Sequence, residues 1–300
     1  MRLDLALIRL HPGLSRRKAS AAIEKGQVTL DGVTAFEPGL AVPESAAIRW
    51  DPNRKALRRA RCSLPLLYED DVLVVIDKPA GLLTVPAAPG RGAGRTALGQ
   101  LQGYARHLNP RRPYVGVVHR IDRDTSGAVA FALTPAVREA LRALFRAHRI
   151  ERRYAALVEG EPAAERGVVD LAIGDAYEGG KRRVARGREP QRHAVTHWRV
   201  AERFRGAALL EVTLETGRQH QIRLHLAHIG LPVLGDRVYG AGEERRPLVA
   251  LRRPMLHARI LGFEHPITGR RVRVESPFPA DLEQVLARLR DRWRARPYQQ

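Results

Sequence analysis

The sequence has 300 residues and contains one cysteine, Cys62. A single thiol cannot form an internal disulfide, and it excludes a zinc site built mainly from cysteines. Aromatic residues make up only 5% of the chain, which argues against a protein built mainly of base-stacking platforms. No apolar run reaches the roughly 18–20 residues that a membrane-spanning helix needs. We therefore expect no membrane association.

Charges interrupt the apolar pattern at the N-terminus, where Arg2, Asp4 and Arg9 fall within the first ten residues. A secretory signal peptide needs an apolar core of about 7–15 residues. We therefore expect a cytoplasmic protein without a signal peptide.

Acidic residues are few, since 32 Asp and Glu stand against 52 Lys and Arg and the formal net charge is +20. This excess favours a polyanionic partner, most simply nucleic acid. Only five of the basic residues are lysine. An arginine-rich, lysine-poor chain can reflect genome base composition, but exchanging one basic residue for another creates no net charge.

The first fifty residues show the pattern of a small α+β unit. Leu3, Leu7 and Leu10 share one face of a predicted helix, and a second helix is predicted over 16–24. The segment QVTLDGVTA (27–35) predicts a β-hairpin, because Asp-Gly is a favoured two-residue turn between alternating strands.

Three cations, Arg16, Arg17 and Lys18, begin the second predicted helix. A helix N-terminus is already positive, so folding gains nothing from them there, and phosphate binding is the better explanation. A merely solvated helix start is the alternative. The pattern RLD…L…LSRRKA…I..G.V.LDG resembles the αL RNA-binding module, which is shared with a small-subunit ribosomal protein. We assign residues 1–52 to such a module.

A basic, aperiodic segment at 53–64 is predicted to be a linker. Strands and helices then alternate over 65–300 without a regular βαβ order, which predicts a second, larger α+β domain with a mixed, largely antiparallel central sheet. An amphipathic helix is expected at 134–148. The glycine- and arginine-rich loops at 90–94 and 179–192 are expected to be mobile.

Two further helices are predicted toward the C-terminus. GRQHQIRLHLAHIG (217–230) is typical of a helix that ends at Gly230. The last helix is expected to be capped at its N-terminus by Asp281.

A charged cluster separates two apolar runs that predict buried strands, Val115–Val118 and 128–133. Asp122 is expected near the apex of the connecting loop, with Arg120 and Arg123 beside it in sequence. Charges are seldom buried unless they are paired or used. The cluster is therefore a candidate functional site.

The segment HRIDRDTSG (119–127) resembles the active-site loop of RluA-type pseudouridine synthases. Flanking segments agree in order with that family: YEDDVLVVIDKPAGLLTVP, ERRYAALVEG, ETGRQHQIRLHLAHIGLPVLGDRVYG and LHARILGFEHPITG. The likeness runs from about 65 to 282 and implies a pseudouridine synthase fold. Ile121 and Gln219 depart from the usual leucine and threonine, and neither change touches the chemistry directly.

The resemblance implies a reaction that needs no cofactor and no metal, the conversion of uridine in RNA to pseudouridine. Asp122 would act at the anomeric carbon as a nucleophile, or as a base and stabiliser of the sugar cation. Arg223 would pair with Asp122, and a cation there favours the ionised carboxylate. Tyr154 would pack on the target base and assist proton transfer.

Three further residues are expected to hold the RNA. Ile222 would pack against the uracil, and Arg120 would keep the target nucleotide flipped out of its stack. His119 would brace the loop.

Each of these residues also has a plain structural interpretation. Asp122 can be a loop carboxylate, Tyr154 a core residue of a strand, and Arg223 one side of a surface ion pair. His220, His225 and His228 suggest zinc, but their spacing lacks the i, i+4 pair of a helical metal site.

Three other functions remain open. Transfer RNA is an alternative substrate to large-subunit ribosomal RNA, which the αL module favours only by analogy. A non-catalytic RNA-binding or ribosome-assembly protein would explain the charge, although it has no use for the carboxylate. A glycoside hydrolase shares the chemistry but needs two opposed carboxyl groups. A monomer is the expected state.

Overall fold

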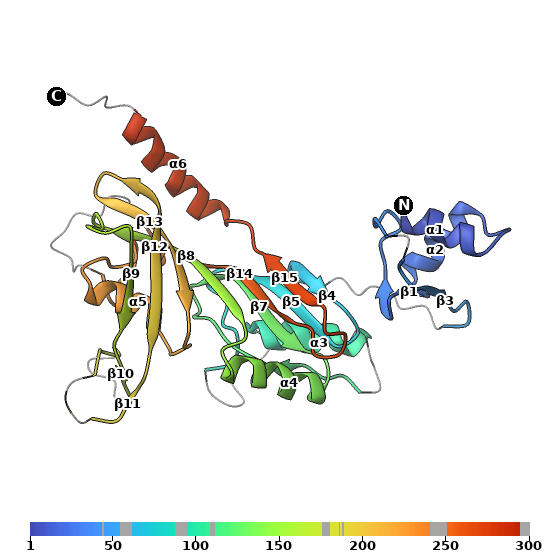
Figure 1. The fold of residues 1–300 in the computed structure, drawn as a ribbon, viewed down its shortest axis with the longest axis horizontal. Coiled ribbons are helices and arrows are strands. Elements are labelled where there is room, and N and C mark those ends of the chain that lie inside the picture. Colours follow the sequence, from blue (N-terminus) through green and yellow to red (C-terminus); the bar gives the residue numbers. More distant parts are fainter. Residues whose placement is uncertain are drawn as a thin grey trace.

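The computed structural model describes residues 1–43, 45–54, 62–87, 95–108, 112–175, 181–185, 187, 189–240 and 251–294. Figure 1 shows a small N-terminal unit beside a larger one that is built around an extended sheet. Most of the predicted linker, the loop at 90–94 and part of the loop at 179–192 lie outside the described residues.

The small unit packs two helices on a three-stranded antiparallel sheet in the order β2-β1-β3. Its elements are α1 (Leu3–Leu10), α2 (Arg16–Glu24), β1 (Val28–Leu30), β2 (Val33–Ala35) and β3 (Ile48–Trp50). These elements enclose a hydrophobic core of their own, whose fully buried members include Leu3, Leu7, Ile23 and Val28. The predicted helix at 16–24 and the predicted hairpin are confirmed.

Local chemistry explains where these elements begin and turn. The Ser15 side chain accepts a hydrogen bond from the backbone N–H of Lys18 at 3.3 Å, as an N-cap does. Asp31 and Gly32 have φ angles of 52° and 85°, which the favoured two-residue hairpin turn requires. Leu10 was expected on the buried face but is 54% exposed, because α1 ends there.

The larger unit follows the order of strands and helices along the rest of the chain. Its elements are β4 (Leu66–Glu69), β5 (Leu73–Lys78), α3 (Ala97–Leu108), β6 (Gly116–Val117), β7 (Ser126–Ala132), α4 (Pro135–Arg146), β8 (Glu151–Glu159), β9 (Arg166–Asp170), β10 (Ile173–Gly174), β11 (Gln191–Arg192), β12 (Val195–Phe204), β13 (Ala207–Leu214), α5 (Gln221–His228), β14 (Leu256–Glu264), β15 (Arg271–Glu275) and α6 (Ala280–Arg294).

Ten of these strands form one sheet with the path β4-β5-β7-β14-β8-β13-β12-β9, while β15 pairs with β14 and β6 pairs with β7. The pairs are antiparallel except for β7 and β14, which are parallel. The fold is therefore α+β with a mixed, largely antiparallel sheet, as the sequence predicted.

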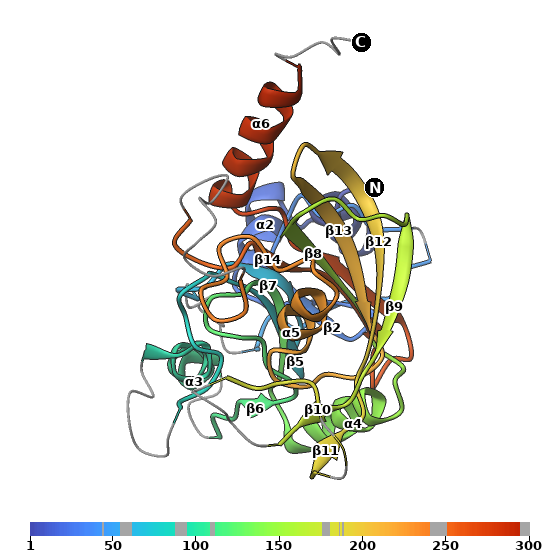
Figure 2. The same cartoon turned by 90° about the vertical axis from the view of Figure 1, so that its left-hand side faces the viewer.

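Helices cover both faces of this sheet. Alternate residues of β5 and β7 contact α4 on one face and α3 on the other, as the two-residue period of a strand dictates. In the other half, alternate residues of β8 and β13 contact α5 and α6 in the same way. Figure 2 shows α5 in front of the strands where the two halves meet.

Several predicted boundaries needed correction. The expected strand Val115–Val118 is only the two-residue β6, and the helix expected at 134–148 is the shorter α4. Asp281 does not precede the last helix, because α6 begins at Ala280. Its carboxylate instead accepts a hydrogen bond from Arg253 Nε at 2.6 Å. Across the described ranges, no helix combines the length and apolarity needed to cross a membrane.

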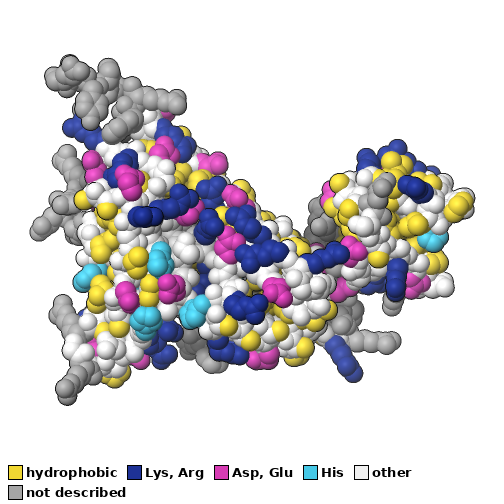
Figure 3. All heavy atoms as spheres, viewed as in Figure 1, with side chains coloured by type: hydrophobic (Ala, Val, Ile, Leu, Met, Phe, Trp, Pro, Cys, Tyr) yellow, Lys and Arg dark blue, Asp and Glu magenta, His cyan; other side chains and the backbone are white. Residues whose placement is uncertain are grey.

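Basic side chains gather in a band along the upper middle of the larger unit in Figure 3, with acidic side chains between them. Ion pairs cross the strands of the sheet, including Arg199–Glu211 at 2.9 Å, Arg153–Glu211 at 3.6 Å and Arg271–Glu151 at 2.7 Å. Exposed pairs of this kind contribute at most about 1 kcal/mol each. They also neutralise part of the positive charge on this surface.

Candidate active site

The loop between β6 and β7 carries Asp122 and is held in place by a lysine of the neighbouring strand β5. The fully buried Lys78 donates hydrogen bonds to the backbone oxygens of Pro79, Leu82 and Arg123, at 2.8, 2.7 and 2.9 Å. These three bonds use all three donors of an ammonium group. Burial lowers the pKa of Lys78 to about 7.

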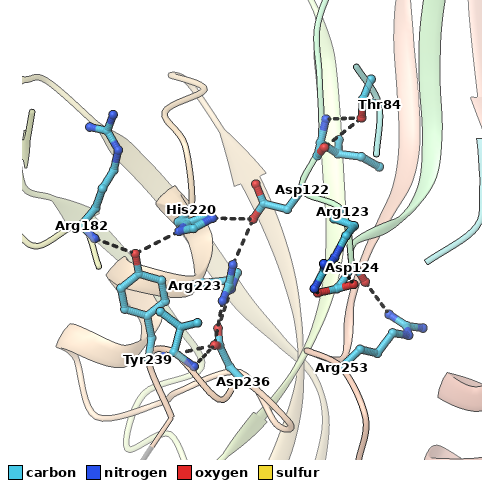
Figure 4. A network of polar contacts seen from close by, with 12 residues as sticks. Thr84, Asp122, Arg123, Asp124, Arg182, His220, Arg223, Asp236, Tyr239 and Arg253 are labelled. Atoms are coloured by element: carbon cyan, nitrogen blue, oxygen red, sulfur yellow. Dashed lines mark hydrogen bonds and ion pairs between the residues drawn. The ribbon is translucent and has the colours of Figure 1, made fainter. Parts of the chain in front are cut away.

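Two more side chains hold the loop at its ends. Thr84 Oγ1 donates to the backbone oxygen of Ile121 at 2.9 Å. Arg253 Nη1 donates to the backbone oxygen of Asp124 at 3.3 Å (Figure 4). The backbone on both sides of Asp122 is therefore positioned by residues that lie far away in the sequence.

His119 connects the same loop to strand β7. Its Nε2 accepts a hydrogen bond from the Ala130 backbone N–H at 3.0 Å, and its ring stacks on Phe145 with centroids 4.7 Å apart. Burial, together with the nearby charge of Arg152, lowers the pKa of His119 to about 3. The imidazole is therefore neutral near pH 7, and its position fits the bracing role expected from the sequence.

Arg223, on α5, joins two carboxylates (Figure 4). Its Nη1 lies 3.4 Å from Oδ2 of Asp122, while Nε and Nη2 bind the two oxygens of Asp236 at 2.5 and 2.8 Å. The Asp236 side chain is fully buried and also accepts the backbone N–H groups of Val238 and Tyr239. Asp236 thus fixes the guanidinium, which in turn faces Asp122.

The ion pair between Arg223 and Asp236 favours the charged form of both side chains. Burial alone would raise the pKa of Asp236, but the hydrogen bonds and charge of Arg223 outweigh burial, and the pKa lies below its ordinary value. Burial alone would lower the pKa of Arg223, but its two carboxylate partners raise it. The Asp122 side chain remains 22% exposed and so stays accessible to a substrate.

His220 and Tyr239 lie next to the side chains of Asp122 and Arg223. His220, with a positive φ of 59°, places Nε2 3.9 Å from Oδ2 of Asp122 and Nδ1 3.0 Å from the Tyr239 hydroxyl. The guanidinium carbon of Arg223 lies 5.1 Å from the centre of the Tyr239 ring, which is close enough for a cation–π interaction. Burial lowers the pKa of His220.

Asp122 faces a cavity of about 460 Å³. Six of the predicted site residues line it: His119, Arg120, Asp122, Tyr154, Ile222 and Arg223. Ile222 is buried, whereas Arg120 is exposed at the mouth. Burial raises the pKa of Tyr154, so its phenol stays protonated near neutral pH.

The three predicted cations of α2 do not reach this cavity, because they belong to the N-terminal unit (Figure 1). Arg17 and Lys18 are exposed. Arg16 places Nε 3.2 Å from the buried carboxylate of Asp4. Arg16 therefore stabilises the fold, which reasoning from the helix dipole had missed.

The histidines that suggested zinc point to different partners. His220 contacts Tyr239, whereas His225 contacts Thr196 Oγ1 at 2.9 Å and the backbone oxygen of Leu171 at 2.9 Å. Among the described residues, no group of three or more His, Cys, Asp or Glu side chains is arranged to hold a metal ion.

Sequence reasoning missed Asp236 and Arg152 as contributors to the site, and it considered His220 only as a possible zinc ligand. Asp236 directly follows Gly235 in the segment LGDRVYG, and glycine commonly marks a turn. A carboxylate that directly follows such a turn was the one available signal for Asp236.

Comparison with known proteins adds to this geometry. Residues 72–228 match the family model described as RNA pseudouridylate synthase, and residues 1–48 match the S4 domain model. An uncharacterised RNA pseudouridine synthase of Mycobacterium tuberculosis is 39% identical over 296 residues, which cover 97% of this chain and 94% of that protein. The ribosomal large subunit pseudouridine synthase D of Pseudomonas aeruginosa is 38% identical and covers 96% and 92%, respectively.

A solved structure agrees with these relatives. Human RNA pseudouridylate synthase domain containing 4 superposes with a TM-score of 0.63 at 25% identity, over 75% of this chain and 93% of that one.

Proposed function

The chain belongs to the RNA pseudouridylate synthase family, and from that premise we propose that Asp122 converts a flipped uridine of large-subunit ribosomal RNA to pseudouridine. The chain is an RNA pseudouridine synthase with an N-terminal S4 RNA-binding domain. The catalytic residue, the target RNA and the division of labour between the units belong to the proposal.

One observation carries the assignment of Asp122. Its carboxylate faces the cavity at 3.4 Å from Arg223, which is held in turn by the buried Asp236. A guanidinium with one fixed partner keeps its free edge in a constant direction, so the Asp122 side chain is held in a constant orientation. A structural loop carboxylate would need neither the cavity nor this support.

In the proposed reaction, the N1–C1′ bond breaks with its electron pair on the uracil. C1′ bonds to the Asp122 carboxylate, or passes through a sugar cation that the carboxylate stabilises. After the base turns, C5 bonds to C1′, a proton leaves C5 and N1 takes up a proton. The product is an isomer of uridine, so atoms and electrons balance without a co-reactant.

Two neighbouring side chains are proposed to contact the uracil. Tyr154 and the buried Ile222 line the same cavity as Asp122 and would pack on the two sides of the uracil. The phenol of Tyr154 would also assist proton transfer during the reaction.

The RNA around the target is proposed to be held by both units. Arg120 at the mouth of the cavity would take the place of the flipped uridine in its stack. Residues 1–52 would bind a structured part of the RNA through Arg17 and Lys18, with 53–64 as the linker to a catalytic domain at 65–300. Ribosomal RNA is favoured because relatives of 38% identity or less carry that substrate in their names. We propose that the active protein is a cytoplasmic monomer.

Mapping pseudouridine in total RNA tests the proposal. Cells with and without the gene are compared by carbodiimide adduct formation and primer extension. We expect a site in large-subunit ribosomal RNA that disappears on deletion and returns with the wild type but not with Asp122→Asn. Restoration by Asp122→Asn would refute the role of Asp122, and a site in transfer RNA would refute the target.

The two remaining alternatives have their own signatures in the same experiment. Binding of ribosomal RNA without any changed site would favour a non-catalytic protein. Release of free uracil from the RNA would indicate a hydrolase.

A further inference from the structure

A second buried arginine, Arg152, lines the same cavity as Arg223. Arg152 belongs to β8, two residues before Tyr154, so both side chains leave the strand on the same face. Both line the cavity that contains Asp122. Arg152 is only 9% exposed.

The surroundings of Arg152 hold its guanidinium in place but do not neutralise it. Nη2 donates to the backbone oxygens of Leu214 and Glu215 at 3.2 and 2.7 Å. The guanidinium carbon lies 5.6 Å from the centre of the Phe145 ring. Among the described residues, no carboxylate lies within ion-pair distance of Arg152, and its buried Nε has no hydrogen-bond partner.

A glycine makes room for this guanidinium. A Cβ atom at Gly217 would lie 2.8 Å from Nη1 of Arg152. The turn before α5 thus approaches the arginine with backbone alone, on the side where the cavity is lined by residues 214–218.

Arg223 and Arg253, which are also buried in the larger unit, have carboxylate partners. Arg223 binds two carboxylates and Arg253 binds Asp281. A buried charge without a counter-charge costs several kcal/mol, and two backbone oxygens compensate only part of it. Since an arginine does not lose its proton in proteins, the cavity keeps an unbalanced positive charge beside Tyr154.

We propose that Arg152 is a further catalytic residue, which stabilises the negative charge that builds on the uracil oxygens while the N1–C1′ bond breaks. The inference rests on the proposed function. When the electron pair of that bond stays with the base, the charge spreads from N1 over O2 and O4. It disappears again when C5 bonds to C1′, C5 loses its proton and N1 gains one, so the contact is strongest in the transition state.

Anionic oxygens of two sources could meet this guanidinium, the uracil and a phosphodiester of the RNA. The position of Arg152 favours the uracil. It is buried and next to Tyr154, whereas Arg120, Arg146 and Arg218 are more accessible and line the same cavity. Phosphates remain outside with the exposed cations, because their own hydration is costly to remove.

The test compares Arg152→Gln and Arg152→Lys with the wild type on an RNA fragment that contains the target uridine. Single-turnover rates at saturating RNA and dissociation constants over a range of salt concentrations are measured. Arg153→Gln is the matched control, because Arg153 is the next residue of β8 and pairs with Glu151 and Glu211 on the opposite face. It should leave both quantities unchanged.

We expect Arg152→Gln to lower the single-turnover rate by roughly 10²–10³, the usual loss when one donor to a developing anion is removed. Arg152→Lys keeps the charge and should retain more of the rate. The dissociation constant and its salt dependence should stay within about twofold of the wild type. A larger dissociation constant, together with a smaller slope of log affinity against log salt concentration, would assign Arg152 to a phosphate and overturn the inference.

A second substrate addresses the leaving group directly. Fluorine at C5 lowers the pKa of the released base, so a 5-fluorouridine target needs less help to leave. Because its C5 has no proton to lose, pseudouridine cannot form on this target, and the rate compared on both RNAs is that of N1–C1′ bond cleavage. Arg152→Gln should therefore lose less rate on that RNA than on uridine. Equal losses on both substrates, or equal rates for Arg152→Gln and Arg152→Lys, would overturn the inference. The variant Asp122→Asn is measured in parallel as a separate test of the proposed function. Full activity of Asp122→Asn would refute that function, independently of the result for Arg152.

Discussion

Asp236 provides the sharpest test of how the site is held together. It makes two ion-pair hydrogen bonds to Arg223, at 2.5 and 2.8 Å, and accepts the backbone N–H groups of Val238 and Tyr239. Asp236→Ala leaves a buried guanidinium without its main counter-charge, and removing one partner of a buried ion pair costs about 3–5 kcal/mol. We expect the free energy of unfolding to fall by at least about 3 kcal/mol.

A double variant separates the ion pair from the space it occupies. Arg223→Met combined with Asp236→Leu removes both charges, and apolar replacement of a whole buried pair is often neutral. The double variant should therefore be more stable than Asp236→Ala in urea unfolding of the full chain at pH 7. A loss below about 1 kcal/mol in Asp236→Ala, or a double variant less stable than it, would refute the reasoning.

The pH dependence of Asp236 gives an independent check. Because its pKa is lowered in the folded state, its stabilising contribution is complete above the unfolded pKa of about 3.9 and is lost as pH falls through the folded value. The wild type should lose stability below about pH 4, and Asp236→Asn should show a flatter curve there. Parallel acid limbs in urea unfolding would contradict this assignment.

Three further predictions concern other parts of the molecule. Arg17→Gln with Lys18→Gln should reduce the slope of log affinity for RNA against log salt concentration by roughly 1.5, at about 0.7–0.9 per lost phosphate contact; an unchanged slope removes these residues from the interface. Gly127→Ala should lower the free energy of unfolding by at least about 3 kcal/mol, because its φ is 115° and a Cβ would lie 2.2 Å from the Ala258 oxygen; urea unfolding measures this, and a loss under 1 kcal/mol contradicts it. The wild type should lose stability as pH falls from 6.5 toward 3, because only the unfolded state then protonates His119, and thermal unfolding of His119→Gln should lack this component.

Sequence reasoning succeeded where a signal is local. The helix at 16–24 and the Asp31-Gly32 turn depend on neighbouring residues, and both elements occur as predicted. Asp122 drew attention because charges between two apolar runs are rare. The wrong assignment of Asp281 was also local, since a capping residue and a first-turn residue differ by one or two positions.

The features that sequence reasoning missed depend on contacts between residues that lie far apart in the sequence. Arg223 lies 101 residues from Asp122, and its relation to that residue came from a family resemblance rather than from any pattern. Whether an arginine is neutralised is decided only when strands and loops meet. Nothing in the order of residues therefore distinguishes Arg152, which has no carboxylate partner among the described residues, from the paired Arg153 beside it.

The parallel pairing of β7 with β14 has a consequence for the order in which the protein is made. Gly127, which ends the loop that carries Asp122, lies against Ala258, and Arg253 binds the backbone of Asp124. Both partners emerge from the ribosome long after the loop, since Arg253 follows Asp124 by 129 residues. The N-terminal unit, by contrast, has a core formed entirely within its own first fifty residues.

Because domains fold as units and N-terminal ones fold first during synthesis, the RNA-binding unit exists before the loop that carries Asp122 is fixed in place. A nascent chain thus acquires its ability to hold RNA first and its ability to modify RNA only after residues 253–258 have emerged.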